Sequence, residues 1–155
     1  MSIGSTKVLS LENKTCLLEA GWDPERNVDT SEYERFLQTH NIQFLPSAKE
    51  FLIVCGWLEV KIPQYRYRNE TDFYHLDPLR AAKNQGLDLD VYEERVGEKL
   101  NVIGEAYTEH MVLMMSESGK VYGAYDHFLT LMGNDGYEAL EALYQGCNWE
   151  TQVID

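Results

Sequence analysis

The hydrophobic periodicity of this chain changes at Gly56, and this change limits the fold more than any other sequence feature. Before Gly56, apolar residues recur at helical spacing in three segments, residues 11–20, 31–40 and 47–55. After Gly56, apolar and polar residues alternate, as in a half-buried strand that stops at Pro63; the apolar positions are Leu58, Val60 and Ile62. Helices followed by strands are typical of the α+β class.

The helix ends carry their own signals. Gly21 and Gly56 directly follow the first and third helical segments, where glycine commonly ends a helix. The second and third segments begin with the serine–glutamate spacing of a capping box, in which each side chain bonds the other residue's backbone N–H. The predicted pairs are Ser31 with Glu34 and Ser47 with Glu50. Arg26 is a candidate partner for Asp29 or for a helix C-terminus.

Strands dominate the rest of the chain. They are predicted for residues 73–76, 100–107, 111–115 and 121–125, while residues 127–132 are ambiguous between strand and helical turn. Residues 116–119 predict a hairpin turn with Gly119 at positive φ. Asp77-Pro78 predicts a break into a loop with Arg80 and Lys83. Two further helices are predicted, over residues 88–96 and from 135 to 146.

These segments predict an α+β fold in which one sheet, mostly antiparallel or mixed, is flanked by helices. The 155 residues fit one domain, residues 1–155, with a core over about 11–146. The alternation of Tyr65 and Tyr67 with arginines predicts a strand with its tyrosines turned inward. A protein interface is the second interpretation of this stretch, and single-stranded nucleic acid the third.

Charge narrows the choice of partner. The net charge is −13, and residues 85–155 carry 14 acidic residues against only Arg95, Lys99 and Lys120. Nucleic-acid binding depends on Lys and Arg neutralising phosphates, so direct DNA or RNA binding is not expected. The acidic surplus has two interpretations: it keeps the protein in solution, or it attracts a basic partner.

Three cysteines, Cys16, Cys55 and Cys147, are an odd number and far apart, which favours free thiols in a reducing compartment over a disulfide framework. The N-terminus lacks the basic start and apolar run of a signal peptide, and no stretch approaches 18 apolar residues. We therefore expect a cytoplasmic protein without a membrane contact; its oligomeric state is left open.

Common catalytic motifs are absent from the sequence. It has no nucleophile elbow, no phosphate-binding glycine loop and no zinc-protease motif. The histidines are widely separated, and no pair has metal-ligand spacing on a helix; they are His40, His75, His110 and His127. No cofactor, metal or catalytic residue is expected, although a Cys–His nucleophile pair stays open.

Short segments, all but 73–78 containing glycine, follow one another in a fixed order along the chain: residues 21–29, 48–58, 73–78, 92–104, 119–122 and 139–146. In order and spacing they resemble the third family of the SUKH superfamily, over residues 11–146. The chain departs from the family at Cys55 and Trp57, where members usually have a phenylalanine-glycine-glycine-leucine turn.

The resemblance implies an α+β fold and a role as an immunity protein in bacterial polymorphic or contact-dependent toxin systems. Family members are thought to bind and block a cognate toxin domain, often a nuclease or a nucleic-acid deaminase, and the family offers no catalytic residue. We therefore expect an acidic surface that docks a basic toxin domain. Its predicted contacts are Asp88, Asp90, Glu93, Glu94, Glu98, Glu105 and Glu109, with Tyr107 as an aromatic anchor.

Two alternatives remain at this point. One is a non-catalytic regulatory or scaffolding module that uses the same fold to bind a cellular protein. The other is a small hydrolase or transferase that uses a cysteine or histidine.

Overall fold

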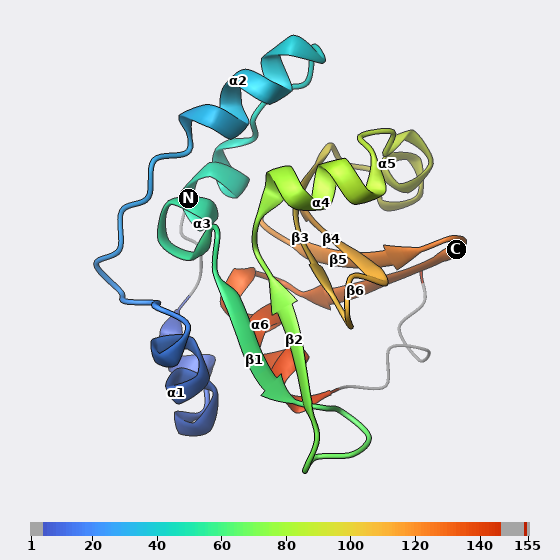
Figure 1. Ribbon diagram of the computed structural model, residues 1–155. Helices are drawn as coiled ribbons and strands as arrows, with labels where there is room; N and C mark the ends of the chain where they lie inside the picture. Colours follow the sequence, from blue (N-terminus) through green and yellow to red (C-terminus); the bar gives the residue numbers. More distant parts are fainter. Residues whose placement is uncertain (1–4, 147–153, 155) are drawn as a thin grey trace.

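The computed structural model of the chain describes residues 5–146 and 154. Its strands form one antiparallel sheet in the order β1-β2-β3-β4-β5-β6, so that each strand pairs with the next one along the chain (Figure 1). The strands are β1 Glu59–Pro63, β2 Thr71–His75, β3 Leu100–Ala106, β4 Met111–Ser116, β5 Val121–Tyr125 and β6 Phe128–Gly133. The predicted α+β arrangement of helices around an antiparallel sheet is confirmed.

A short 3₁₀ turn, Thr6–Val8, precedes the helices. The helices are α1 Leu11–Glu19, α2 Ser31–Thr39, α3 Pro46–Cys55, α4 Pro78–Gln85, α5 Asp90–Val96 and α6 Gly136–Gln145. The last helix begins as predicted, since Asp135 is its N-cap and accepts a hydrogen bond from Glu138 N. The ambiguous segment after His127 is a strand, β6.

Both faces of the sheet are covered. Neighbouring residues of a strand point to opposite faces, and in β4 Leu113 belongs to one hydrophobic core while Met114 belongs to the other. The larger core includes residues of α1, α3 and α6, and α6 lies behind the sheet in Figure 1. The smaller core is covered from α5 by Tyr92 and Val96. This double coverage explains why every residue of β3 and β4 is buried.

The β1–β2 hairpin meets the other four strands at one place. Among the described strands, β2 and β3 share a single residue pair, His75 with Glu105. The backbones approach closely there, because a Cβ added to Gly104 would lie 2.1 Å from the His75 carbonyl oxygen. Glycine is therefore the residue that this contact allows.

The two predicted capping boxes are wrong. Thr30 and Leu45 are the N-caps of α2 and α3, and neither makes a side-chain cap bond. Pro46 starts α3 one residue early, because its fixed φ and missing N–H suit the first helical position. The hydroxyl of Ser47 instead donates to the Ser116 carbonyl (2.6 Å) and ties α3 to β4.

The predicted loop after Asp77 is also wrong, because this segment is helix α4. The Asp77 side chain accepts a hydrogen bond from Arg80 N (3.0 Å), and Pro78 occupies the first turn. Asp-Pro is thus the start signal of a helix here, in which aspartate is the N-cap and proline the first helical residue.

The tyrosines after β1 do not turn inward as predicted. The strand ends at Pro63, and the side chains of Tyr65 and Tyr67 lie in the following loop, 44% and 57% exposed. Proline has no N–H to donate to a neighbouring strand, so the strand stops there. The alternating tyrosines and arginines that follow are therefore not part of the sheet.

The turn after α3 takes an unusual backbone shape. Trp57 adopts a left-handed conformation (φ 61°), which is uncommon for a residue other than glycine. Its N–H donates to the Leu76 carbonyl (2.7 Å), and the Arg26 guanidinium donates to the carbonyls of Val54 (3.0 Å) and Gly56 (2.7 Å). The prediction that Arg26 binds a helix C-terminus is confirmed, and these bonds hold the turn.

Glu141 on α6 fixes the start of α1. Its carboxylate accepts hydrogen bonds from Ser10 N (2.9 Å), Asn13 Nδ2 (3.0 Å) and Gln145 Nε2 (2.6 Å). Partial burial acts to raise the pKa of Glu141, but these hydrogen bonds outweigh it and lower the pKa below the ordinary 4.5.

We expect Glu141→Gln to destabilise the protein by roughly 1 kcal/mol at neutral pH, a modest value because solvent screens this partly exposed group. The folded-state pKa lies below the unfolded one, so the carboxylate stabilises the fold above the unfolded value, and this stabilisation is lost as pH falls through the folded value. Urea unfolding between pH 7 and acid conditions should therefore show the difference from wild type shrinking below about pH 4.5. Glu32→Gln, at an exposed position, is the control, and a difference that does not change with pH would contradict the prediction.

No helix within the described residues is both long and apolar enough to cross a membrane.

Candidate protein-binding surface

The predicted contact residues fall into three places in the structure. Asp90, Glu93, Glu94 and Glu98 lie together on α5 and the loop after it, beside a shallow hollow. Asp88 and Tyr107 line a larger cleft. Glu105 and Glu109 belong to a polar cluster at the joint between β2 and β3.

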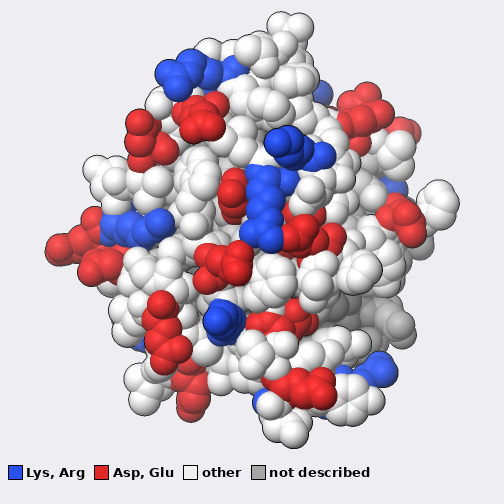
Figure 2. All heavy atoms as spheres, viewed as in Figure 1, with Lys and Arg blue, Asp and Glu red and all other residues white. Residues whose placement is uncertain are grey.

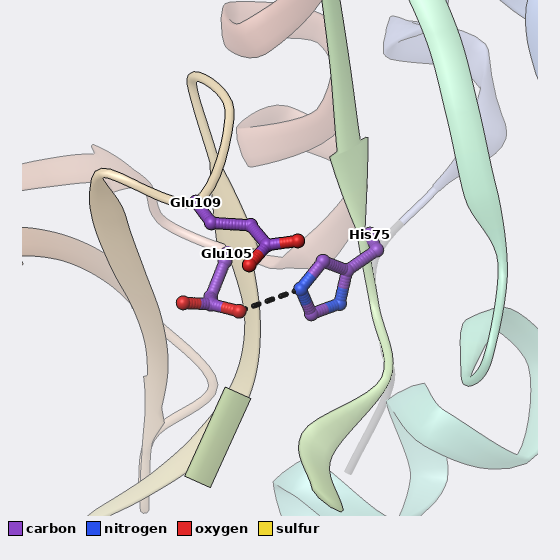
Figure 3. A group of neighbouring side chains, drawn as sticks. All are labelled: His75, Glu105 and Glu109. Atoms are coloured by element: carbon purple, nitrogen blue, oxygen red, sulfur yellow. Dashed lines mark hydrogen bonds and ion pairs between the residues drawn. The ribbon is translucent and has the colours of Figure 1, made fainter. Parts of the chain in front are cut away.

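In this cluster, His75 from β2, Glu105 from β3 and Glu109 from the following turn point toward one another (Figure 3). His75 Nε2 lies 2.7 Å from Glu105 Oε1, and both side chains are buried. The Asp77 N–H donates to His75 Nδ1 (3.1 Å), which assigns the ring proton to Nε2 and makes Nε2 the donor to Glu105.

Helix α4 completes the cluster. Asn84 Nδ2 donates to Glu105 Oε1 (3.0 Å) and to Glu109 Oε2 (2.8 Å), while Gln85 Nε2 donates to Glu105 Oε2 (2.7 Å). The Arg80 guanidinium pairs with Glu109 and, at 3.0 Å, with Glu59 of β1. The side chains thus connect three strands and a helix at the one place where the two parts of the sheet meet.

The structure corrects the expectation that Glu105 contacts a partner. Its side chain is 0% exposed and accepts three hydrogen bonds from within the protein. Its strand is covered on both faces, and the charge stays buried because His75, Asn84 and Gln85 satisfy it. Glu105 therefore stabilises the fold and is not available for docking.

The ligand atoms of His75, Glu105 and Glu109 lie within 4.8 Å of one another, close enough for a metal ion. To bind one, His75 Nε2 would have to release its proton, which would then sit on Nδ1 against the Asp77 N–H. The carboxylate oxygens also already accept hydrogen bonds from α4. The donor set favours a hydrogen-bonded structural cluster over a metal centre.

The hollow beside α5 has a volume of about 430 Å³ and is lined mainly by carboxylates. Three of them hold local structure: Glu93 accepts from Leu100 N (2.9 Å), Glu98 from Ser118 N (2.9 Å) and Glu117 from Lys99 N (3.0 Å). Glu117 joins the hollow from the β4–β5 turn, 19 residues beyond Glu98 in the sequence. Asp90 and Glu94 are exposed at its edge.

The larger cleft has a volume of about 870 Å³. It lies between the α4–α5 segment, the β1–β2 loop and the turns that follow β3 and β5, and its walls are rich in aromatic rings. The rings of Tyr65 and Tyr107 meet edge to face at 5.8 Å, and those of Tyr125 and Phe128 stack at 4.9 Å. The Tyr92 hydroxyl donates to the Asp126 carbonyl (2.8 Å) and joins α5 to the β5–β6 turn.

Acidic and basic side chains are interleaved on the face of the molecule that Figure 2 shows. Basic side chains gather over α4 and have acidic ones on both sides, in keeping with the Arg80 pairs described above (Figure 2). The negative charge on this face is thus partly compensated around α4. Of the predicted contacts, Asp88, Asp90, Glu94 and Glu98 form no ion pair with a described residue, whereas Glu93 Oε1 lies 3.9 Å from Lys99 Nζ.

The cysteines show no nucleophilic character where the structure describes them. Cys55 is fully buried, and burial raises the pKa of its thiol to about 12. Burial and the nearby Glu19 also raise the pKa of Cys16. Both are free thiols, as predicted, and Cys147 lies outside the described residues. At neutral pH the thiol form dominates at both positions, which disfavours the cysteine-enzyme alternative.

The fold and these surfaces define an acidic α+β module in which helices surround an antiparallel sheet and aromatic and acidic side chains meet at a cleft. The family model described as SUKH-3 immunity protein matches residues 10–146. The chain belongs to this family, which confirms the resemblance found in its sequence. A search of curated proteins and a search of solved structures each found no match.

Sequence reasoning missed several residues of the cleft, among them Tyr92, Tyr125 and Asp126. Tyr92 is spaced with Leu89 and Val96 as on the apolar stripe of a helix, a pattern that indicates a core position and gives no sign of the cleft. Tyr125 and Asp126 fall where the fifth strand ends, so a tyrosine and an aspartate at a predicted strand end are the signal that was available.

Proposed function

We propose that this protein is a non-catalytic cytoplasmic immunity protein that binds and neutralises a cognate toxin domain of a bacterial polymorphic or contact-dependent toxin system, and that this toxin acts on nucleic acid. The observation that carries the proposal is the family match over residues 10–146. Membership of an immunity protein family implies a toxin as partner, and the acidic surplus after residue 85 suits a basic one.

The surplus of acidic residues suggests how the protein neutralises the toxin. A toxin that acts on nucleic acid needs Lys and Arg in its substrate groove to neutralise phosphates. Exposed carboxylates around α5, Asp90 and Glu94 among them, match such a groove in charge. The immunity protein then competes with the nucleic acid for the groove and needs no chemistry of its own.

The test is protection of a bacterial host. A candidate toxin domain, sought among the products of neighbouring genes, is expressed in the host with and without the protein, and we expect growth to be lost without the protein and restored with it. Purified protein should also stop the toxin from degrading or modifying nucleic acid at a one-to-one molar ratio.

Two outcomes would count against the proposal. A host that dies equally with and without the protein, although both chains are expressed and folded, contradicts the immunity role. Protection against a toxin that leaves nucleic acid intact contradicts the claim that the toxin acts on nucleic acid, and the immunity role then still stands.

A further inference from the structure

We propose that the tyrosine-lined cleft receives an arginine side chain of the toxin and is the specific anchor of the complex. This inference rests on the proposed function, because it assigns the partner of the cleft to the toxin. The anchor adjoins the acidic hollow, because Tyr92 of α5 lines the cleft while Asp90 and Glu94 of the same helix line the hollow.

The cleft has the size and the walls of a binding site. Its volume of about 870 Å³ falls in the range of ~300–1,000 Å³ that is usual for ligand pockets. Tyrosine supplies a large rigid surface with few rotatable bonds, which is why it is enriched where proteins bind one another. Tyr125 at the rim is 47% exposed and Tyr65 is 44% exposed, so part of their ring surface is open to a partner.

The residues that line the cleft carry two carboxylates against the one guanidinium of Arg66, and this excess of negative charge sets the charge of the ligand. Asp88 and Asp126 line the cleft, both are exposed, and neither forms an ion pair with a described residue. Asp88 is two residues before α5 and Asp126 is directly after β5, so the fold brings together two acidic groups that are 38 residues apart in the sequence. Together with the −11 net charge of residues 85–155, they favour a cation and repel a phosphate.

The aromatic walls favour arginine over lysine. A guanidinium is planar, stacks on aromatic rings and binds a carboxylate with two parallel hydrogen bonds, whereas an ammonium is a strongly hydrated point charge. The protein already uses this contact at the cleft, where the Arg66 guanidinium carbon lies 5.6 Å from the centre of the Tyr65 ring. Tyr125, stacked on Phe128 opposite this loop, offers the second platform.

The first experiment measures toxin affinity. Asp88→Asn with Asp126→Asn removes both charges and keeps the side-chain shapes, and asparagine tolerates the left-handed backbone of Asp126 (φ 49°). We expect toxin binding to weaken by about tenfold to a hundredfold, since close charge pairs across interfaces are worth at least this much. Glu25→Gln with Glu32→Gln changes the net charge equally at exposed positions outside the cleft, and it should leave affinity within about twofold.

The aromatic ring of Tyr125 is tested separately. Tyr125→Ala should weaken toxin binding about tenfold, while Tyr125→Phe, which keeps the aromatic face, should bind nearly as wild type. Wild-type affinity in both Tyr125→Ala and the double asparagine variant, in a protein that still binds the toxin, overturns the cleft proposal and leaves the immunity role standing.

A second experiment needs no toxin. The free protein is titrated with a blocked Ala-Arg-Ala peptide and with Ala-Lys-Ala while backbone amide NMR shifts are recorded. We expect the arginine peptide to shift amides of the cleft, including Tyr92 and Tyr125, at several-fold lower concentration than the lysine peptide, and not in the double asparagine variant. Shifts that are equal for both peptides, or that spread over acidic surfaces outside the cleft, overturn the proposal.

Discussion

Replacing Glu105 with alanine is expected to destabilise the protein by roughly 2–4 kcal/mol, because a hydrogen bond to a charged group is worth about 1.5–3 kcal/mol and a buried donor left without an acceptor costs about 1–3 kcal/mol. The change leaves His75 Nε2, in a side chain that is only 1% exposed, without its acceptor. The amide groups of Asn84 and Gln85 each lose one acceptor and keep a bond to Glu109. It also removes the side-chain bond at the single residue pair between β2 and β3. Urea unfolding followed by circular dichroism measures the loss.

Control variants separate the loss of the His75–Glu105 hydrogen bond from a non-specific loss of stability. Glu94→Ala removes an exposed carboxylate, and its effect should stay within about 0.5 kcal/mol. His75→Ala should destabilise strongly in the wild type but much less in the Glu105→Ala background, because the two residues act as one unit. Glu105→Gln keeps one acceptor oxygen and should fall between the alanine variant and wild type. An effect of Glu105→Ala as small as that of Glu94→Ala would contradict the structural role.

Reversing two charges on α5 is expected to slow toxin association at low salt by about tenfold or more, with a smaller effect on dissociation. The change is Asp90→Lys with Glu94→Lys, both at exposed positions at the edge of the acidic hollow. Glu93 is left in place because it accepts a hydrogen bond from Leu100 N (2.9 Å), so its replacement would also disturb the fold. Stopped-flow or surface-binding kinetics across salt concentrations provides the rates.

Salt is the internal check on this prediction. At about 1 M salt the screening length is only ~3 Å, so the variant and wild type should then associate at similar rates. Glu25→Lys with Glu32→Lys makes the same change in net charge on other exposed segments and should slow association much less. Equal slowing by both pairs at low salt would show an effect of net charge alone and would remove this surface from the docking interface.

The strands were predicted most accurately. Residues 121–125 were assigned exactly, and the two preceding strands were right to within one residue. These segments are bounded by turn residues, and Gly119 adopts the positive φ (92°) that its turn required. Their apolar character is strong because helices cover both faces of the sheet.

Helix starts were predicted less well, because several starts compete within a few residues. At α3, Pro46 set the first turn before Ser47 could cap it, and the serine hydroxyl found the Ser116 carbonyl instead. At α4, an Asp-Pro pair, which would interrupt a helix if it lay inside one, instead begins a helix after strand β2. The start of α3 involves a bond to a distant strand, and the start of α4 depends on whether the chain enters the Asp-Pro pair from a strand or from a helix. A local sequence pattern specifies neither.

The sequence by itself determined the α+β class, the strand positions, the acidic half of the chain and the family, because each of these depends on periodicity, composition or the order of short segments. Only the tertiary structure decided which acidic residues are available. Glu105 and Glu94 were both predicted as partner contacts, yet Glu105 is buried against His75 and Glu94 is exposed. It also brought Asp88 and Asp126 to one cleft. Burial and proximity arise from the packing of segments that are tens of residues apart, such as His75 against Glu105, and local patterns do not encode this packing.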